Sequence, residues 1–434
     1  MSKEVSLDDI VSLAKRRGFV YQGSEIYGGL AGTWDYGPLG TQLKRNIQNI
    51  WWQMFVEQRD DMYGLDSAIL MNQKIWQASG HATGFNDPML ECSNCHSRFR
   101  ADHIHDNKCP VCGKKNVFGE SRLFNMMFST NIGPVQDEGS LAYLRPETAQ
   151  GIFVNFKNVV DTFSPDLPFG IAQIGKAFRN EISPRDFIFR SREFEQMEIE
   201  YFVDPKAWEK EFEKWVENIH AFLQAIGIDK TLVHQLEVAD ADRAHYSKRT
   251  IDFEFTYPFG KSELLGLAYR GSFDLENHQK ASGKGLEYRP KDGSKPFTPH
   301  VIEPSFGIDR IVLALLVTAY ASDEQNGEKR TYLKLSASLA PVKVAVSPLL
   351  KNKQELVKKA REVYEVLKKE YGAVMWDDNG NIGKRYRRQD EIGTPYCVTI
   401  DFDSLEHDDV TVRDRDTTKQ KRVKISNLLT ELKL

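Results

Sequence analysis

Cysteine is scarce in this sequence: it occurs five times in 434 residues, and four of the five lie between positions 92 and 112. This clustering excludes the evenly spread disulfide framework of a secreted protein. Long hydrophobic runs are also missing, because the longest, residues 311–321, is about half of the ~20 residues that a membrane-spanning helix needs. The N-terminus carries no apolar segment of the kind that a secretory signal has. We therefore expect a cytoplasmic protein without a membrane partner.

An excess of charge of one sign is absent as well. Lys and Arg number 58 and Asp and Glu 62, a net charge of −4, which excludes the uniformly basic proteins that coat nucleic acids. The glycine-rich segment 18–40 contains no Gly-x-Gly-x-x-Gly, and Gly260-Lys261-Ser262 lacks the first glycine of a phosphate-binding P-loop. With 41% hydrophobic residues, the chain is long enough for about two to four domains.

Hydrophobic periodicity predicts the main helices and strands of the first 330 residues. A helix should run from its cap at Ser6 to Gly18, and the seven glycines at positions 18–40 predict tight turns or close backbone approach. The long helix expected from Pro38 carries an apolar stripe that fits either a core helix or one shared with a second subunit. Further helices are expected at 205–227, after a cap at Asp204, and at 311–321, and strands at 251–255 and 263–268.

The polar stretch 322–330 predicts a break in the organisation of the chain. Beyond it, strands and helices alternate over ~95 residues, which indicates a compact α/β domain with a mostly parallel sheet. The expected strands are 342–346, 374–376 and 396–400, and the expected helices are 354–371 and 427–434. Segment 384–395 combines basic and aromatic residues, a composition typical of RNA contacts or of a solvated helix face.

The clustered cysteines form two Cys-x-x-Cys pairs thirteen residues apart: Cys92, Cys95, Cys109 and Cys112. Each tight turn presents two thiolates to one tetrahedral cation, so the pattern predicts structural Zn²⁺. Four cysteines leave no open position on the metal, and we expect it to hold an insertion together. Three nearby histidines are alternative ligands, although a solvent-facing or phosphate-binding role fits them better: His96, His103 and His105.

Arginines interleave with acids on two predicted strands joined by a loop at Ser183-Pro184. Such a charge-laced hairpin is typical of a solvated sheet face, but four phenylalanines would cover its other side: Phe178, Phe187, Phe189 and Phe194. Arginines beside an aromatic wall suit a planar base and its phosphates. Further along, Arg310 opens the apolar helix, and an arginine at a helix start reinforces a phosphate site.

These segments resemble motifs 2 and 3 of class II aminoacyl-tRNA synthetases, and the whole set is similar to glycyl-tRNA synthetases of the homodimeric type. The resemblance rests on four runs: Arg145–Gly151 (RPETAQG), Arg179–Arg185 (RNEISPR), Arg192–Phe194 (REF) and Glu303–Gly307 (EPSFG). It extends over nearly the whole chain, because Ser79-Gly80-His81, Phe99–His103, Phe273-Asp274-Leu275 and the C-terminal part fit as well.

The resemblance implies a fold, domain bounds and an assembly. Residues 1–330 would form an α+β catalytic domain with an antiparallel sheet, the class II synthetase fold. A small zinc-knuckle insertion would occupy residues 90–115 within it, and residues 338–434 would form an α/β anticodon-binding domain. The family also implies a homodimer, with residues 38–63 as the motif 1 helix.

The reaction that the resemblance implies joins glycine to ATP, giving glycyl-adenylate and pyrophosphate, and then transfers glycine to the 3′ end of tRNA(Gly). Its partners are therefore ATP, glycine, tRNA(Gly) and the Mg²⁺ that accompanies ATP. Attack of a carboxylate on the α-phosphorus requires a fixed cation. The implied catalytic residues are Arg179 at the α-phosphate, Glu181 at the adenine amino group and Arg310 at the γ-phosphate.

The same resemblance implies two binding sets. In the ATP set, Phe194 would stack on the adenine, and Glu263 would lie where a carboxylate holds Mg²⁺. The set consists of Arg179, Asn180, Glu181, Phe189, Arg190, Arg192, Glu193, Phe194, Glu263, Leu264, Gly307 and Arg310. In the glycine set, acidic groups would bind the ammonium of glycine, and close packing would exclude larger side chains. The set consists of Arg100, Glu147, Phe194, Gln196, Glu198, Glu303, Ser305 and Gly307. Arg270 and Asp274 fit the pocket floor.

Three other interpretations compete with this one. The first is a class II enzyme for another small amino acid, which Glu303-Pro304-Ser305 disfavours. The second is a catalytically inactive, synthetase-like RNA-binding accessory protein, which is expected to lose Arg179 and Arg310. The third is a zinc-dependent nucleic-acid module, which explains only residues 92–112.

Overall fold

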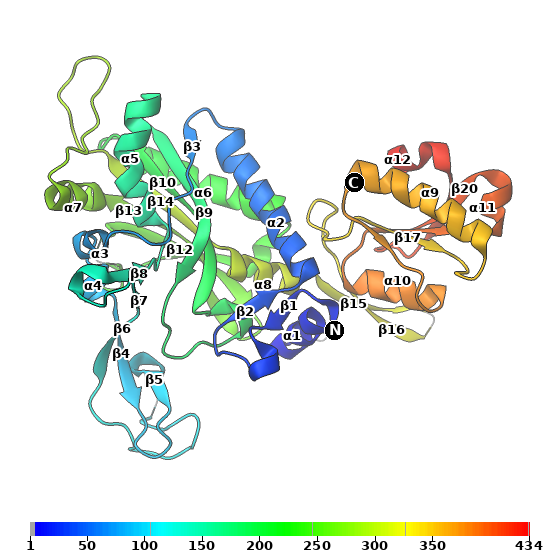
Figure 1. Ribbon diagram of the computed structural model, residues 1–434, viewed down its shortest axis with the longest axis horizontal. Helices are drawn as coiled ribbons and strands as arrows, with labels where there is room; N and C mark the ends of the chain where they lie inside the picture. The colour runs from blue at the N-terminus through cyan, green and yellow to red at the C-terminus, as the bar shows by residue number, and fades with distance from the viewer. Residues whose placement is uncertain (1–4, 105, 245, 326, 433) are drawn as a thin grey trace.

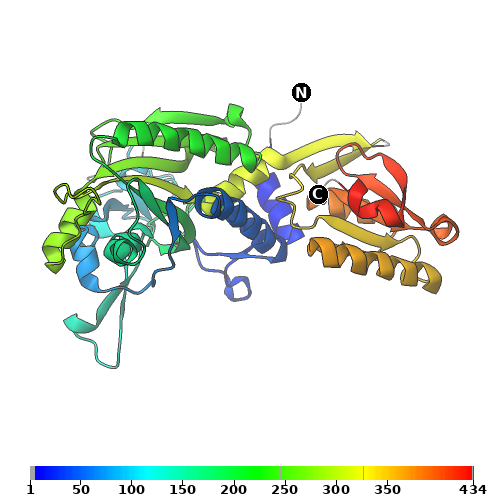
Figure 2. The same ribbon diagram turned by 90° about the horizontal axis from the view of Figure 1, so that it is seen from above.

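The computed structural model describes residues 5–104, 106–244, 246–325, 327–432 and 434. A larger N-terminal part and a smaller C-terminal part lie side by side along the long axis of the molecule (Figures 1 and 2). Within the described residues, no helix combines the length and the apolar character needed to cross a lipid bilayer.

The N-terminal part is built on a seven-stranded sheet with the order β11-β12-β13-β14-β10-β9-β3. Every neighbouring pair is antiparallel except β3 and β9, which confirms the expected antiparallel sheet. The strands are β3 (Met62–Gly64), β9 (Phe169–Phe178), β10 (Glu193–Val203), β11 (Val233–Glu237), β12 (Arg249–Tyr257), β13 (Gly260–Gly271) and β14 (His300–Gly307).

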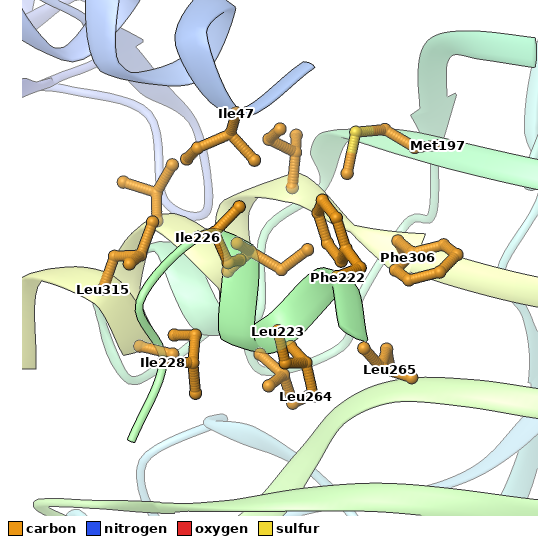
Figure 3. Packing of buried hydrophobic residues seen from close by; sticks show 14 of the residues in the cluster. Ile47, Met197, Phe222, Leu223, Ile226, Ile228, Leu264, Leu265, Phe306 and Leu315 are labelled. Atoms are coloured by element: carbon orange, nitrogen blue, oxygen red, sulfur yellow. The ribbon is translucent and has the colours of Figure 1, made fainter. Parts of the chain in front are cut away.

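Four helices bury their apolar stripes against one face of this sheet and form the main core (Figure 3). They are α1 (Leu7–Arg17), α2 (Pro38–Trp52), α6 (Trp208–Ala225) and α8 (Ile308–Ala319). Ile47 of α2, Phe222 of α6 and Leu315 of α8 meet Met197 and Phe306 of the sheet in this core. The long helix after Pro38 is therefore a core helix, one of the two alternatives that its apolar stripe left open.

The opposite face of the sheet carries a second, smaller core at one end. It is covered by α5 (Ala149–Phe163) and by α7 (Phe273–Ser282), with Phe156, Phe169 and Phe202 at its centre. The remainder of that face is polar because side chains alternate along each strand. On β10, Met197 and Ile199 enter the main core, whereas Gln196, Glu198 and Glu200 point to the other side.

Several predicted helix ends differ from the structure. The first helix is confirmed, with a Ser6–Asp9 capping box and a left-handed Gly18. The motif 1 helix expected to reach residue 63 ends at Glu57 in a π-helical turn, because β3 begins at Met62. Residues 205–207 form a turn closed by Asp204, so the next helix starts at Trp208 instead of Pro205.

The cysteine cluster lies in a separate lobe that projects from the N-terminal part (Figure 1). Its three-stranded antiparallel sheet has the order β5-β4-β6, formed by β4 (Asn86–Glu91), β5 (Arg98–Arg100) and β6 (Arg122–Asn125). A two-stranded sheet of β7 (Phe128–Asn131) and β8 (Leu141–Leu144) connects this lobe to α5.

The C-terminal part is a five-stranded sheet with the order β18-β17-β19-β20-β21, flanked by helices. The expected helix 354–371 and the strands 374–376 and 396–400 are confirmed, and the first expected strand is found two residues further on, as β17. A mostly parallel sheet is wrong: two of the four pairings, β19 with β20 and β20 with β21, are antiparallel, and residues 415–419 join β20 to β21 as a hairpin. The elements are β17 (Val344–Pro348), α9 (Gln354–Tyr371), β18 (Val374–Trp376), α10 (Ile382–Glu391), β19 (Tyr396–Ile400), α11 (Phe402–His407), β20 (Asp409–Asp414), β21 (Gln420–Lys424) and α12 (Leu428–Glu431).

The polar stretch 322–330 forms most of a hairpin that joins the two parts. The hairpin consists of β15 (Tyr320–Gln325) and β16 (Glu328–Leu333), so the apolar helix ends at Ala319 instead of 321. Arg330 is fully buried between Asp323 of the hairpin and Asp390 of α10, and it donates to the Arg415 carbonyl at 2.6 Å. The composition break is therefore an ordered connection.

Candidate active site

A cavity of about 320 Å³ opens on the polar face of the large sheet. Its walls are the loop 179–192, strands β10, β12, β13 and β14, and the first turn of α8. Fourteen of the eighteen predicted ATP- and glycine-binding residues line it: Glu147, Arg179, Glu181, Phe189, Arg190, Phe194, Gln196, Glu198, Glu263, Leu264, Glu303, Ser305, Gly307 and Arg310. Residues from five separate stretches of sequence thus meet at one place.

Guanidinium groups and aromatic rings gather in one region of the cavity. Arg179 lies over the ring of Phe194 at 5.3 Å and, in the part of the chain that the structure describes, has no carboxylate within 4.0 Å. Arg310 lies over Phe189 at 4.7 Å and pairs with Glu263 at 2.8 Å. Cations beside flat apolar surfaces can bind phosphates and stack a base.

The Nε–H donor of Arg190 makes no hydrogen bond within the described residues. Arg190 approaches Glu181 at 3.3 Å through one terminal nitrogen, while its Nε is buried. A buried donor without a partner costs stability, so its retention at a cavity wall favours a role toward a bound ligand.

Asp252 is a cavity residue that the sequence analysis did not select. It lies on β12 beside Gly266, where a methyl group would come within 4.0 Å of both its carboxylate and that of Glu263. Burial and the charge of Glu263 raise the pKa of Asp252 to about 7. The signal for it was the alternation of strand 251–255, which puts residue 252 on the face away from the core.

A buried cluster of carboxylates surrounds Arg270. Its guanidinium donates to both oxygens of Asp274 at 2.7 and 2.9 Å and to Glu303, and it stacks under Tyr246 at 3.7 Å. Glu147 lies 3.9 Å from Arg270 and 3.3 Å from His81. Arg270 and Asp274 are buried and do not line the cavity themselves, so their place at the pocket floor stays a prediction.

The members of this cluster hold their charge to different degrees. Burial alone would raise the pKa of Glu147, but His81 and Arg270 hold it below its ordinary value. Burial raises the pKa of Glu303 to about 8, against the opposing effect of Arg270. Glu198 accepts hydrogen bonds from the Thr148 backbone at 3.0 Å and from the Ser305 hydroxyl at 2.8 Å, yet burial raises its pKa too. The cluster offers oxygen acceptors to a small cation.

Comparison with known proteins identifies the arrangement. Residues 128–319 match the model of the tRNA synthetase class II core domain (G, H, P, S and T), and residues 343–433 match that of the anticodon binding domain. A glycine–tRNA ligase of Thermobifida fusca is 49% identical over 98% of this chain and 97% of its own length. One of Borrelia garinii subsp. bavariensis is 50% identical over 99% and 97%. The chain belongs to the glycine–tRNA ligases.

A solved structure shares the fold of this glycine–tRNA ligase family member at low sequence identity. The prolyl-tRNA synthetase of Giardia lamblia, solved with prolyl-adenylate, is 15% identical and has a TM-score of 0.69 over 98% of this chain and 77% of its own. The resemblance to class II synthetases is therefore confirmed for family and fold. A zinc module alone accounts for only a small part of such a glycine–tRNA ligase.

Four of the residues predicted for this glycine–tRNA ligase lie outside the cavity. The backbone of Asn180 bonds to the Met126 carbonyl, and Glu193 pairs at the surface with Lys176 at 2.9 Å. Arg192 donates to the carbonyls of Glu181 and Ala31. Arg100 belongs to the cysteine-bearing lobe, where it pairs with Asp87 at 2.8 Å and Asp102 at 3.0 Å.

The four clustered cysteines have the geometry of a tetrahedral thiolate site. All four sulfurs lie within 4.8 Å of one another, and the Cys92–Cys112 and Cys95–Cys109 pairs are both 3.7 Å apart. Zn–S bonds of about 2.3 Å at tetrahedral angles give sulfur separations of about 3.8 Å. Neither His96 nor His103 belongs to the cluster, and His105 lies outside the described residues.

The basic segment of the C-terminal part divides into structural and exposed residues. Arg385 is buried and donates to the carbonyls of Pro348, Asp378 and Gly380, and Arg388 pairs with Asp377 at 2.6 Å. These two arginines hold α10 to the end of β17 and to the turn after β18. Lys384, which is exposed, and Arg387, which is half-buried, make no such side-chain contacts among the described residues.

Glu200 differs from the other acids of the glycine–tRNA ligase pocket. It is fully buried on β10, and neither carboxyl oxygen has a hydrogen-bonding partner among the described residues. The pairing of Glu198 with Ser305 and of Tyr201 with Ile302 puts it opposite Glu303. Burial, and then the charge of Glu303, raise the pKa of Glu200 well above its ordinary value. A carboxyl group in this position is held in the neutral form.

We expect Glu200→Gln to stabilise the protein increasingly as the pH rises. Because the pKa of Glu200 is raised in the folded state, its contribution to stability is complete below the unfolded pKa and is lost as the pH rises; glutamine does not titrate. The difference between the free energies of unfolding of Glu200→Gln and of the wild type should increase by up to about 1.4 kcal/mol per pH unit. Urea denaturation at pH 6, 7 and 8 measures this difference, with exposed Glu193→Gln as the control. A difference that stays constant contradicts a neutral Glu200.

Proposed function

We propose that this chain activates glycine with ATP to form glycyl-adenylate and then transfers glycine to the 3′ end of tRNA(Gly). One observation carries the proposal: a single cavity joins two guanidinium groups, those of Arg179 and Arg310, to the buried carboxylates of Glu147, Glu198 and Glu303. Arginines suit the triphosphate, and carboxylates suit an ammonium group.

Arg179 and the residues near it have separate roles in the formation of glycyl-adenylate. The Arg179 guanidinium binds the α-phosphate and stabilises the charge that develops as the glycine carboxylate attacks it. Phe194, on which Arg179 already lies, stacks on the adenine, and Glu181 accepts from the adenine amino group. Arg310 binds the γ-phosphate at the other end, which keeps the leaving pyrophosphate in line.

The fit of a divalent cation is supported by the carboxylates at the phosphate end. Glu263 and Asp252 both face the space over Gly266, and oxygen donors are the ligands that Mg²⁺ prefers. Bound there with ATP, the ion would neutralise phosphate charge. Arg310 lowers the pKa of Glu263, which keeps that carboxylate ionised for the task.

Selection of glycine follows from the acids and from the packing around them. Glu147, Glu198 and Glu303 bind the ammonium, and we expect the walls around them to exclude larger side chains. Exclusion by size can discriminate strongly against larger substrates, so glycine selection requires no separate editing domain.

We expect ATP–pyrophosphate exchange with glycine alone among the twenty amino acids. Arg179→Ala should reduce this exchange by at least about 100-fold, because a preorganised donor to developing charge is lost. Arg185→Ala is the control, since Arg185 lies in the same loop outside the cavity and pairs with Asp186. Exchange with another amino acid would reassign the substrate, and no exchange with any would favour the inactive RNA-binding accessory protein.

The domain bounds follow from the same proposal. Residues 1–330 form the catalytic domain with the insertion 90–115, and residues 338–434 bind the anticodon through Lys384 and Arg387 of α10. Arg330, fully buried against Asp390 of α10, supports a fixed placement of the two domains. None of the five cysteines, all of which the structure describes, forms a disulfide, which supports the proposed location in the reducing cytoplasm.

The proposal includes one structural Zn²⁺ held by Cys92, Cys95, Cys109 and Cys112. We expect the purified protein to contain about one zinc per chain by mass spectrometry of the metal, as four thiolates occupy all its positions. Cys109→Ser should lose most of the metal and lower the melting temperature of the lobe. Cys397→Ser is the control, because this buried fifth cysteine lies far along the chain in β19 and should retain one zinc. Full zinc content in Cys109→Ser would contradict the ligand set.

The proposed homodimer is supported by an exposed apolar tip between β1 (Val20–Gln22) and β2 (Trp34–Tyr36). Ile26 and Tyr27 are 88% and 87% exposed, and Leu30 is 57% exposed. Adjacent exposed apolar side chains of this size mark interaction surfaces. We expect a dimer in analytical ultracentrifugation and a shift toward monomer in Tyr27→Asp. Val111→Asp, at another exposed apolar residue, should remain dimeric; a monomeric wild type would refute the assembly.

A further inference from the structure

The glycine-rich N-terminal segment is in direct contact with the loop that carries Arg179. The backbone N–H of Arg192 donates to the Gly32 carbonyl at 2.7 Å, and its side chain donates to the Ala31 carbonyl at 2.9 Å. The same side chain donates to the carbonyl of Glu181, a residue of the cavity wall, at 3.1 and 3.2 Å. Arg192 therefore joins the segment to the loop 179–192 without entering the cavity itself.

Glycine is required at position 32 for two reasons. Its φ of +75° lies in the left-handed region, and a Cβ there would lie 2.6 Å from the Cβ of Pro184. The loop therefore rests closely on the segment. Two residues further on, the ring of Trp34 packs edge-on against Phe187 with centroids 4.8 Å apart. These contacts hold the loop 179–192 against the N-terminal segment.

At its end, the segment reaches the helix that carries Arg310. The Tyr36 hydroxyl donates to Asp309 Oδ1 at 2.5 Å, and the other oxygen of Asp309 accepts from the Glu195 backbone N–H at 2.9 Å. Asp309 is buried and directly precedes Arg310. One carboxylate therefore ties β2, β10 and the start of α8 together.

The charges around this contact agree with a fixed hydrogen bond. Lys44 pairs with the side chain of Glu195 at 2.5 Å, and its ammonium lies 4.8 Å from the centre of the Tyr36 ring. Burial, followed by the charge of Asp309, raises the pKa of Tyr36 well above its ordinary value, so the hydroxyl remains a donor.

We infer that residues 31–36 form a strap that holds the loop of Arg179 and the helix start of Arg310 at the spacing an ATP triphosphate requires. Tyr36 and Asp309 are positioning residues for Arg310, and Gly32 is a positioning residue for the loop. None of the three touches the nucleotide in this inference, which rests on the proposed binding of ATP by Arg179 and Arg310.

Tyr36→Phe tests the strap because it removes one hydroxyl and retains the ring. In ATP–pyrophosphate exchange, the KM for ATP should rise about 10-fold, the loss expected for a hydrogen bond to a charged group, while the KM for glycine changes less than about 2-fold. Tyr21→Phe, on the neighbouring strand β1, is the matched control and should leave both values unchanged. Asp309→Asn should reproduce the effect, and the double variant should be no worse than the single ones.

Gly32→Ala provides an independent test at the other end of the strap. It should also raise the KM for ATP selectively, with the oligomeric state unchanged in ultracentrifugation. An unchanged KM for ATP in Tyr36→Phe and Asp309→Asn, or an equal rise in both KM values, would overturn the strap. If Arg179→Ala and Arg310→Ala retain full exchange, the proposed ATP site itself is at fault.

Discussion

The buried guanidinium of Arg270 is the constraint on which the rest of the pocket depends. Four acidic side chains share this cation: Glu198 and Glu303 from the sheet, Glu147 from the turn before α5, and Asp274 from α7. Removing a buried charge from such a set typically costs several kcal/mol. Because Asp274 and Glu303 take up its donors, the remaining acids are left with acceptor capacity directed at the cavity. The packing around Arg270 thus lines the pocket with oxygen acceptors.

The two ends of the cavity are built by different means. The phosphate end depends on segments remote in sequence, a loop and a helix start, which other parts of the chain must hold in place. The acidic end depends on side chains of adjacent strands, whose spacing the sheet itself sets.

Much of this could be predicted from sequence, for identifiable reasons. Arg179, Glu303 and Arg310 lie in short ordered motifs, and the four cysteines have a spacing with a chemical meaning. Asp252 and Glu200 were missed because their importance arises from pairing β12 with β13 and β10 with β14. The antiparallel strands β20 and β21 were missed because their alternation is masked by charged residues.

Strand β10 restricts the insertions and deletions that the sequence can accept. Met197, Ile199, Tyr201 and Val203 enter the main core, whereas Gln196, Glu198 and Glu200 lie on the opposite face. Inserting or deleting one residue within Glu193–Val203 would exchange these two sets. Glu198 and Glu200 would then enter a hydrocarbon interior, and Met197 would face the substrate. Length variation in this family should therefore collect in the surface turns, such as residues 288–297, and be absent from this strand.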